Sequence, residues 1–263
     1  MSEEKLSLLS GNYFKEYSKK AEVLKGDSLS AKAIKEGFSV KDFEHYLVAS
    51  SVFSSKIEGN TLDLNSFMRN RNDKAGAKRK EVREIEDLVS AYKFAAKSKI
   101  TEINFLKAHA MLSKTLLEKA SERGKYRKAQ VGVFDGDTGK PVYMAVEGEH
   151  VKAEIKKLFT DIKALSQSKL NKKEVLYYAS MIHLWIAMIH PFADGNGRTA
   201  RLLEKWFIAS HLGKTAWAVN SEKYYWDNRP AYYQNIALGY NYYALKWERC
   251  LPFLLMLPKA IKN

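Results

Sequence analysis

The sequence predicts a mainly α-helical protein that carries a single β-hairpin. Apolar residues recur with the helical period in most long segments of the chain. Glycine and proline, which interrupt helices, number only 14 and 5 among 263 residues. Alternating apolar residues with several glycines are concentrated in residues 124–144, which predicts the hairpin. Because 46% of the residues are hydrophobic, we expect one fairly large domain, or one domain with a small extension.

The expected helices follow from the spacing of apolar side chains. Residues 1–27 are polar and show only weak periodicity. Gly59 is a plausible C-terminal cap of the first clear helix, because glycine tolerates the left-handed conformation found there. Helices are expected over residues 41–57, 64–71, 80–97, 102–118, 147–165 and 171–189, from about 196–198 through 208, and in one or two segments of 222–257.

The hairpin is expected over residues 124–144, with its turn at Asp135–Gly139. Val131 and Val133 supply the alternation that is typical of a strand. The apolar helix over 171–189 runs directly into His190-Pro191. Since proline disfavours helical geometry in the preceding residue, His190 should lie at or just past the end of that helix.

Cysteine usage and hydropathy indicate a soluble protein of a reducing cytoplasm. Cys250 is the single cysteine of the sequence, so it cannot form an intramolecular disulfide, and its apolar neighbours favour a role as a small core residue. No apolar run reaches about 18 residues, the length at which a membrane span becomes plausible. A signal peptide is not expected either.

The formal net charge of +14 allows a second class of function. Such a field attracts polyanions, so a basic nucleic-acid-binding or regulatory module is an alternative to an enzyme. The lysines are spread over many segments, which favours a general basic surface over a nucleic-acid-binding site.

Residues 190–201, His-Pro-Phe-Ala-Asp-Gly-Asn-Gly-Arg-Thr-Ala-Arg, contain the strongest functional signal. Gly195, Asn196 and Gly197 can bring consecutive backbone N–H groups together in a concave anion-binding nest. The following helix adds the positive end of its dipole. Arg198 and Arg201, three residues apart, can hold phosphate oxygens on one side of that helix.

Two further residues of this segment complete a reactive site. Asp194 supplies one carboxylate beside the anion site, and one carboxylate plus substrate phosphates is a common way to hold Mg²⁺. His190 can accept a proton near neutral pH. The combination predicts phosphoryl or nucleotidyl transfer to a hydroxyl group, with His190 as the general base and the arginines stabilising charge.

This string resembles the signature of the Fic family, His-Pro-Phe-x-Asp/Glu-Gly-Asn-Gly-Arg-x-x-Arg, and matches it at every fixed position. Gly124-Lys125-Tyr126-Arg127, followed by the hairpin, is similar to the flap that positions the target segment in that family. The resemblance extends over about residues 40–257. It implies a mainly α, Fic-type helical bundle with one β-hairpin flap (about 124–144) and an active loop (190–201).

The resemblance implies a protein adenylyltransferase, which transfers AMP from ATP to a Ser, Thr or Tyr hydroxyl of a target protein. His190 would deprotonate that hydroxyl, Asp194 would coordinate Mg²⁺, and Arg201 would contact the γ-phosphate. Phe192 would anchor the loop in the core. The other residues implied to bind the nucleotide or its phosphates are Gly195, Asn196, Gly197, Arg198, Val133, Phe134, Tyr232 and Tyr240, the last standing where relatives have asparagine.

Residues 54–59, Ser-Ser-Lys-Ile-Glu-Gly, resemble the inhibitory motif of the same family, Ser/Thr-x-x-x-Glu-Gly/Asn. The resemblance implies a self-inhibited enzyme in which Glu58 pairs with Arg201 and keeps the γ-phosphate away, with Ser54 as the first residue of the motif. We therefore divide the chain into an N-terminal region carrying an inhibitory helix, residues 1–75, and a Fic core, residues 76–263.

Several alternatives stay open. The same loop could transfer UMP, phosphocholine or phosphate, or could remove AMP. ATP and a target protein are the implied partners, with self-modification and a homo-oligomer as further possibilities.

Overall fold

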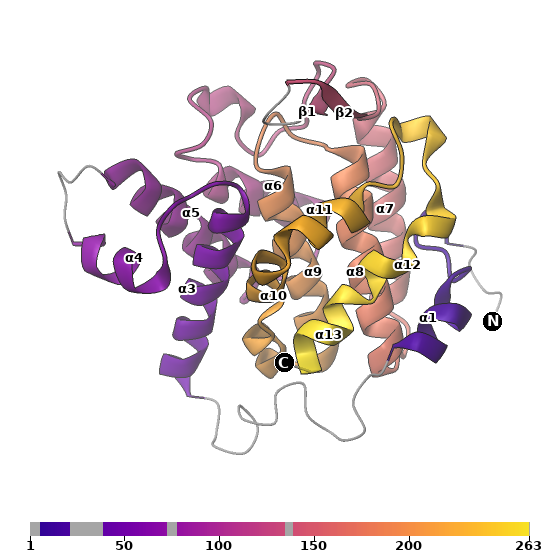
Figure 1. Cartoon of the computed structure of the whole chain (residues 1–263), viewed down its shortest axis with the longest axis horizontal. Helices are drawn as coiled ribbons and strands as arrows, with labels where there is room; N and C mark the ends of the chain where they lie inside the picture. The colour runs from indigo at the N-terminus through magenta and orange to yellow at the C-terminus, as the bar shows by residue number, and fades with distance from the viewer. Residues whose placement is uncertain (1–5, 22–38, 73–77, 135–138, 263) are drawn as a thin grey trace.

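The computed structural model describes residues 6–21, 39–72, 78–134 and 139–262, and it is mainly helical (Figure 1). One antiparallel pair of strands, β1 (Gly132–Phe134) and β2 (Pro141–Met144), forms the sheet of these described residues. The predicted fold class, a mainly α protein with one β-hairpin, is confirmed.

The helices follow one another in chain order, and the pair β1–β2 lies between α6 and α7. Their bounds are α1 (Phe14–Lys20), α3 (Val40–Ile57), α4 (Leu64–Asn70), α5 (Arg79–Ala95), α6 (Glu102–Leu112), α7 (Val151–Ser166), α8 (Lys172–Ile189), α9 (Asn196–Leu212), α10 (Ser221–Asp227), α11 (Arg229–Ile236), α12 (Leu251–Leu254) and α13 (Met256–Lys262). Short 3-10 turns lie at Ala120–Glu122, Lys214–Ala218, Tyr242–Ala244 and Trp247–Arg249.

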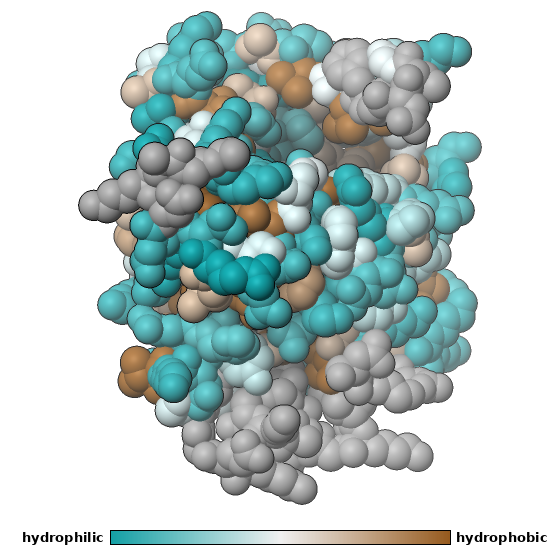
Figure 2. All heavy atoms as spheres, turned by 60° about the vertical axis from the view of Figure 1, so that its left-hand side comes forward, coloured by the Kyte–Doolittle hydropathy of each residue, from teal (hydrophilic) through white to brown (hydrophobic). Residues whose placement is uncertain are grey.

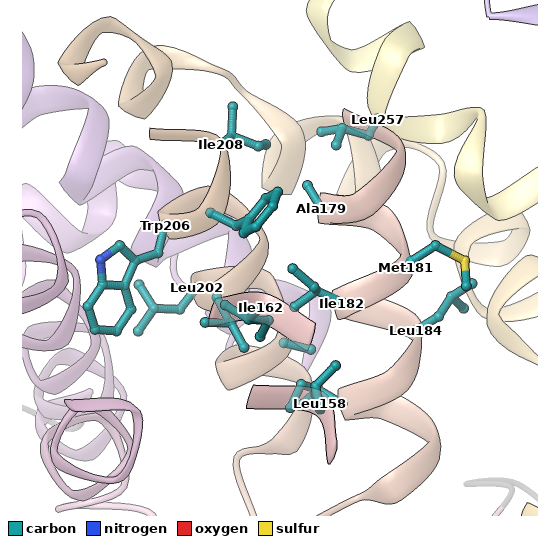
Figure 3. Packing of buried hydrophobic residues seen from close by; sticks show 14 of the residues in the cluster. Leu158, Ile162, Ala179, Met181, Ile182, Leu184, Leu202, Trp206, Ile208 and Leu257 are labelled. Atoms are coloured by element: carbon teal, nitrogen blue, oxygen red, sulfur yellow. The ribbon is translucent and has the colours of Figure 1, made fainter. Parts of the chain in front are cut away.

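Helices α8 and α9 form the centre of the molecule and pack against each other along their length. In Figure 3, Leu158 and Ile162 of α7 lie beside Ile182 of α8 and Leu202 of α9, while Leu184 points to the opposite side of α8. Burying a side chain of this size stabilises the fold by roughly 1.5–3 kcal/mol. Because α8 is covered on both sides, it has no continuous polar face.

The end of α8 and the start of α9 enclose a loop over residues 190–195. Asn171 and Glu174 form a capping box that starts α8. The helix ends at Ile189, and the next residue, His190, adopts φ +51° and ψ +59° directly before Pro191. This confirms that His190 lies just past the end of the helix. Gly195, with φ +78°, then precedes α9.

Helix α3 lies on one flank of the molecule, next to α4 and α5 (Figure 1). It begins with a capping box between Ser39 and Asp42. A small separate core joins these three helices, built from Val52, Leu62, Phe67, Val82, Ile85 and Val89. The helix ends at Ile57, and Gly59 follows with φ +98°, so the predicted glycine cap is confirmed. The capping box therefore fixes the start of α3, and packing against α4 and α5 fixes its position.

Two predicted helix bounds were wrong. The helix expected over residues 102–118 ends at Leu112, because beyond it the backbone N–H of Thr115 donates to the side chain of Asp87 in α5 and not to a helical carbonyl. The helix expected from residue 147 begins only at Val151. A Cβ atom at Gly148 would lie 2.0 Å from the Lys128 carbonyl oxygen, so the chain runs against that segment before the helix can start.

The C-terminal part is more broken than the one or two helices expected over 222–257. Pro230 and Pro252 lie in the first turns of α11 and α12, since proline suits the first turn of a helix but not its interior. Between them Gly239 lies so close to Ala244 that a Cβ would be 2.6 Å from its carbonyl oxygen. Asn241 then accepts hydrogen bonds from the N–H groups of the next short turn. Proline and close backbone contact therefore divide this segment.

The remaining expectations concern the hairpin turn and the surface. Residues 135–138 of the predicted turn lie outside the described residues. Within the part of the chain that the structure describes, no helix combines the length and apolarity needed to cross a bilayer. Figure 2 shows that the flank of α3, α4 and α5 is mostly hydrophilic, with hydrophobic residues scattered over it. Such scattered residues are ordinary on a protein surface.

Candidate active site

His190 is held in an unusual backbone conformation at the end of α8. Among the described residues it is the one non-glycine residue with positive φ, a conformation that costs free energy and is concentrated at functional sites. Its Nδ1 atom lies 3.2 Å from the Ala187 carbonyl oxygen. A carbonyl can only accept, so Nδ1 carries the proton and the lone pair of Nε2 is available to accept another. Burial lowers the pKa of His190, which keeps the ring neutral near pH 7.

Arg127 fixes the backbone around His190. Its Nε donates to the His190 carbonyl at 2.6 Å, and Nη2 donates to the carbonyls of Ile189 and Val146 at 3.2 and 2.5 Å. The backbone N–H of Arg127 also donates to the Pro191 carbonyl at 2.9 Å. Since Arg127 is 6% exposed, these charge-assisted bonds form away from water. The segment that leads to β1 is thereby joined to the loop.

The loop is closed from inside by Asn196. Its side-chain oxygen accepts from the Phe192 N–H at 2.8 Å, and its amide donates to the Phe192 carbonyl at 2.9 Å. The side chain of Asn196 therefore shapes the loop, which leaves its backbone N–H as the group that can face a ligand. Phe192 is fully buried, so its predicted place in the core is confirmed.

His109 of α6 packs against the active loop and forms a hydrogen bond with its backbone. Its ring stacks on Phe192 with centroids 3.5 Å apart. Nδ1 accepts the N–H of Gly124 at 2.9 Å, so Nε2 carries the proton and donates to the Asp194 carbonyl at 3.0 Å. Burial lowers the pKa of His109 to about 4. A neutral histidine thus connects the beginning of the flap segment with the active loop.

The N-terminal end of α9 forms an anion site, by which we mean the backbone around Gly197 together with the side chains of Arg198 and Arg201. The first helical backbone bond runs from Thr199 N to the Gly195 carbonyl. The N–H groups of residues 196–198 therefore lack intrahelical acceptors, as at every helix start. Combined with the helix dipole, they favour an anion at this position.

Glu58 places its carboxylate in this anion site. Its Oε1 atom lies 2.7 Å from Nη2 of Arg201. A Cβ atom at Gly197 would lie only 2.2 Å from the same oxygen, so the carboxylate rests directly against the glycine backbone. The side chain of Glu58 is 31% exposed, whereas that of Arg201 is fully buried. The carboxylate therefore occupies the anion site.

Charge keeps this pair ionised. Burial opposes ionisation of Glu58, but Arg201 and then Arg198 outweigh it, and the pKa of Glu58 is lowered. Burial would lower the pKa of Arg201, but its neighbours Tyr232 and Glu58 outweigh that effect and raise it. Ser54 completes the arrangement, because its hydroxyl and carbonyl oxygens accept from Nε and Nη2 of Arg201 at 2.9 and 3.0 Å.

Arg198 is the second cation of the anion site, and its guanidinium is only partly used in hydrogen bonds and ion pairs. Its Nη2 lies 3.6 Å from Glu84, which is a loose ion pair. Its Nε is buried, and the described residues offer that atom no hydrogen-bond partner. A buried donor without a partner is costly, so a phosphate oxygen here would satisfy it.

A buried polar chain supports Arg201 from behind. Nη1 of Arg201 donates to the Tyr232 hydroxyl at 3.1 Å. That hydroxyl lies 3.0 Å from Nε2 of His183, whose Nδ1 is 2.8 Å from Glu204. Tyr225 also donates to Glu204. The chain runs Arg201, Tyr232, His183, Glu204, and all four side chains are buried.

One helical turn further along α9, Lys205 makes a second connection to α3. Its Nζ donates to Ser50 at 2.6 Å, to Glu222 at 2.5 Å and to the Val219 carbonyl at 2.7 Å. Ser50 of α3 thus contacts Lys205 of α9, and Ser54 contacts Arg201. The two serines are four residues apart in α3, as are the two cations in α9. Both Lys205 and Glu222 are fully buried.

Asp194 is the candidate magnesium ligand. It is exposed, and its Oδ1 accepts the N–H of Gly195 at 2.5 Å. Among the described residues, no group of three His, Cys, Asp or Glu side chains could hold a metal alone. The donor set fits Mg²⁺, which is usually held by one or two carboxylates together with substrate phosphates and water.

The residues proposed for base contacts lie in two places. Tyr232 is inside, with its hydroxyl on Arg201 and His183. Val133 is 38% exposed on β1, and Tyr240 is 59% exposed. The Tyr240 carbonyl accepts the N–H of Met144 at 2.9 Å, which places it along β2. The backbone of Phe134 ends β1, but its side chain lies outside the described residues. Their contacts with a nucleotide stay a prediction.

Sequence reasoning missed the supporting side chains. Apolar periodicity places His109 and His183 in helices and a short motif contains Arg127, but none of these patterns predicts the hydrogen bonds of the three side chains. A histidine on the apolar face of a helix, such as His109 or His183, is a signal that a buried polar partner exists. It does not indicate which partner, because that depends on tertiary packing.

Comparison with known proteins agrees with the geometry of the loop. The model of the Fic/DOC family matches residues 99–208. Over 183 residues the chain is 30% identical to the "Protein adenylyltransferase Fic" of Nematostella vectensis, and over 159 residues it is 30% identical to that of Aedes aegypti. These matches cover 65% and 56% of this chain but only 38% and 29% of the two relatives.

Solved structures show the same fold over more of the chain. A Fic family protein from Desulfovibrio desulfuricans G20 has a TM-score of 0.72 at 21% identity, with 94% of this chain and 69% of that chain covered. A Fic domain containing signaling protein from Bacteroides thetaiotaomicron VPI-5482 has a TM-score of 0.65 at 17% identity, with 94% and 93% covered. The segment from residue 99 to residue 208, with the active loop near its end, therefore belongs to the Fic/DOC family, and the chain around it has the fold of Fic proteins.

Proposed function

We propose that this chain is a protein adenylyltransferase that transfers AMP from ATP to a Ser, Thr or Tyr hydroxyl of a target protein, which includes copies of itself. The observation that carries the proposal is the pairing of a neutral histidine with an anion site in one loop. The curated relatives named as adenylyltransferases support the same reaction.

The protein's own groups account for the proton and the phosphates. The target hydroxyl gives its proton to Nε2 of His190, and its oxygen attacks the α-phosphorus of ATP. The bond between that phosphorus and the oxygen bridging to the β-phosphate breaks, and pyrophosphate leaves. Arg198, Arg201 and the N–H groups at the start of α9 stabilise the phosphate charge. Asp194 would hold Mg²⁺, which when bound supplies further positive charge to the phosphates.

Glu58 restrains this reaction in our proposal. Its carboxylate lies against Gly197 and Arg201, so an ATP molecule with its γ-phosphate at Arg201 must first displace it. With the carboxylate in place, the γ-phosphate meets a like charge and loses its arginine. ATP then binds without the geometry needed for in-line attack.

Positional labelling of ATP tests the reaction. The Glu58→Gly variant is incubated with ATP labelled in the α-phosphate or the γ-phosphate, together with Mg²⁺ and cell lysate. AMP transfer leaves the α-label on protein and releases the γ-label as pyrophosphate. Mass spectrometry of the labelled band should show the mass of one AMP on a hydroxyl residue.

Two controls sharpen the result. His190→Ala combined with Glu58→Gly should abolish labelling, because the general base is lost. Wild-type protein should label at least about tenfold less than Glu58→Gly, the factor expected when a charged hydrogen bond is removed. Retention of the γ-label would indicate phosphate transfer, and preference for UTP would indicate UMP transfer; either outcome contradicts the proposal.

A further inference from the structure

Two adjacent tyrosines of α11 contact Arg201 and Ile57, the residue that precedes Glu58. The Tyr232 hydroxyl accepts from Arg201. The Tyr233 hydroxyl donates to the carbonyl oxygen of Ile57 at 2.9 Å. One tyrosine therefore supports the cation, and its neighbour contacts the residue directly before the carboxylate.

The position of the Ile57 carbonyl explains why it needs a hydrogen-bond donor from outside the helix. It belongs to the last turn of α3, where carbonyl groups have no intrahelical donor. The backbone N–H groups that follow go elsewhere: Glu58 and Asn60 donate to Ser55, and Gly59 donates to Lys56. Tyr233 thus satisfies an acceptor that the helix itself leaves open. A bond to residue 57 restricts the peptide from which the Glu58 side chain starts.

Cations and aromatic rings strengthen the same contact. The guanidinium of Arg229 lies 5.5 Å from the ring centre of Tyr233 and 5.6 Å from that of Trp226. The ammonium of Lys56, in the last turn of α3, lies 4.6 Å from the Trp226 ring. Such cation–π contacts contribute modestly at exposed sites. Together they hold the end of α3 against α10 and α11.

We propose that Tyr233 is a positioning residue for Glu58: its hydroxyl fixes the end of α3 so that the carboxylate stays on Arg201. This inference rests on the proposed function, in which Glu58 competes with ATP. Without the hydroxyl, the end of α3 moves more freely and ATP displaces Glu58 more easily. The Tyr233 ring is 42% exposed, so its substitution by phenylalanine should not disturb the core.

ATP affinity measured by calorimetry tests the proposal without turnover when His190→Ala is present in every variant. Tyr233→Phe keeps the ring and removes only the hydroxyl. It should tighten ATP binding about three- to tenfold, the factor expected for one hydrogen bond. In the Glu58→Gly background the same substitution should change nothing. Tyr243→Phe is the matched control, since Tyr243 is also exposed and its hydroxyl bonds Glu147.

Hydrogen exchange gives a readout that needs no nucleotide. Amides of residues 58–60 should exchange faster in Tyr233→Phe than in wild type, and at unchanged rates in Tyr243→Phe. If Tyr233→Phe tightens ATP binding equally with Glu58 and with Gly at position 58, the hydroxyl acts on the nucleotide and the proposal is overturned. Unchanged ATP affinity together with unchanged amide exchange would also overturn it. Absence of AMP labelling by Glu58→Gly would instead contradict the proposed reaction, while the exchange result would still decide the role of Tyr233.

Discussion

Oε1 of Glu58 lies 2.7 Å from Nη2 of Arg201 although 143 positions separate the two residues in the chain. Arg201 is fully buried, and it keeps bonds to Ser54 and Tyr232 that do not involve the carboxylate. Removing Glu58 therefore leaves the arginine in position for a different anion.

We first predict how ATP affinity depends on residue 58. Glu58→Gly removes both the charge and the hydrogen bond, and it should tighten ATP binding about tenfold or more. Glu58→Gln removes the charge but keeps an acceptor, and it should give an intermediate affinity. Calorimetry in the His190→Ala background measures both. Equal affinity of the three proteins would show that residue 58 does not compete with ATP.

The second prediction concerns the pH dependence of the reaction. Burial lowers the pKa of His190, whereas Glu58 opposes that shift. In Glu58→Gly that one opposing contribution is lost, so His190 should take up a proton only below its ordinary pKa near 6.5. The value of kcat/KM for Glu58→Gly should stay constant above neutral pH and fall on the acid side of about 6.5. An acid limb centred above that value would contradict the assignment of His190 as a base in this environment.

The third prediction tests the connection between α3 and α9 at Lys205. Lys205→Met leaves the carboxylate of Glu222 buried without its cation, and this should cost about 3–5 kcal/mol of the free energy of unfolding. Urea denaturation measures the loss. The double variant Lys205→Met with Glu222→Gln removes the isolated charge and should recover part of it. A change below about 1 kcal/mol in the single variant would argue against a buried pair.

The fourth prediction concerns His109. His109→Ala leaves the N–H of Gly124 and the carbonyl of Asp194 without partners, at a cost of about 3 kcal/mol or more in unfolding free energy. Activity in the Glu58→Gly background should fall further than stability alone explains, because the loop loses its support. His45→Ala, which removes an exposed histidine of α3, is the control and should change neither quantity.

Local spacing predicted the centre of the molecule well. The helix before His190, the break at His190-Pro191 and the new helix near Asn196 depend on proline, glycine and apolar periodicity within one segment. The end of α6 could not be predicted in this way. Leu116 and Leu117 continue the apolar helical period, but the side chain of Asp87 in α5 accepts the backbone N–H of Thr115.

The candidate site divides along the same line. A short motif contains His190, Asp194 and the two arginines, so the sequence alone indicated them. The pairing of Glu58 with Arg201 was inferred only through resemblance to a known motif. The bonds of Arg127, His109 and Tyr233 go to backbone carbonyl or N–H groups, which every residue possesses. Residue types therefore cannot identify such partners before the chain is folded.

The bonds of Lys205 and those of Arg201 both connect α9 to α3, but they differ in whether a bound ligand can replace them. Lys205 contacts groups that no substrate resembles, whereas Arg201 contacts a carboxylate that a phosphate can replace. A molecule switched on by ATP or by a binding partner would thus keep its shape, its exposed surface and nearly all of its thermal stability. Under the proposed restraint by Glu58, the resting and working forms would differ by a few atoms at one helix end. Methods that report size or overall shape would then not distinguish them, whereas probes placed at residues 57–60 would.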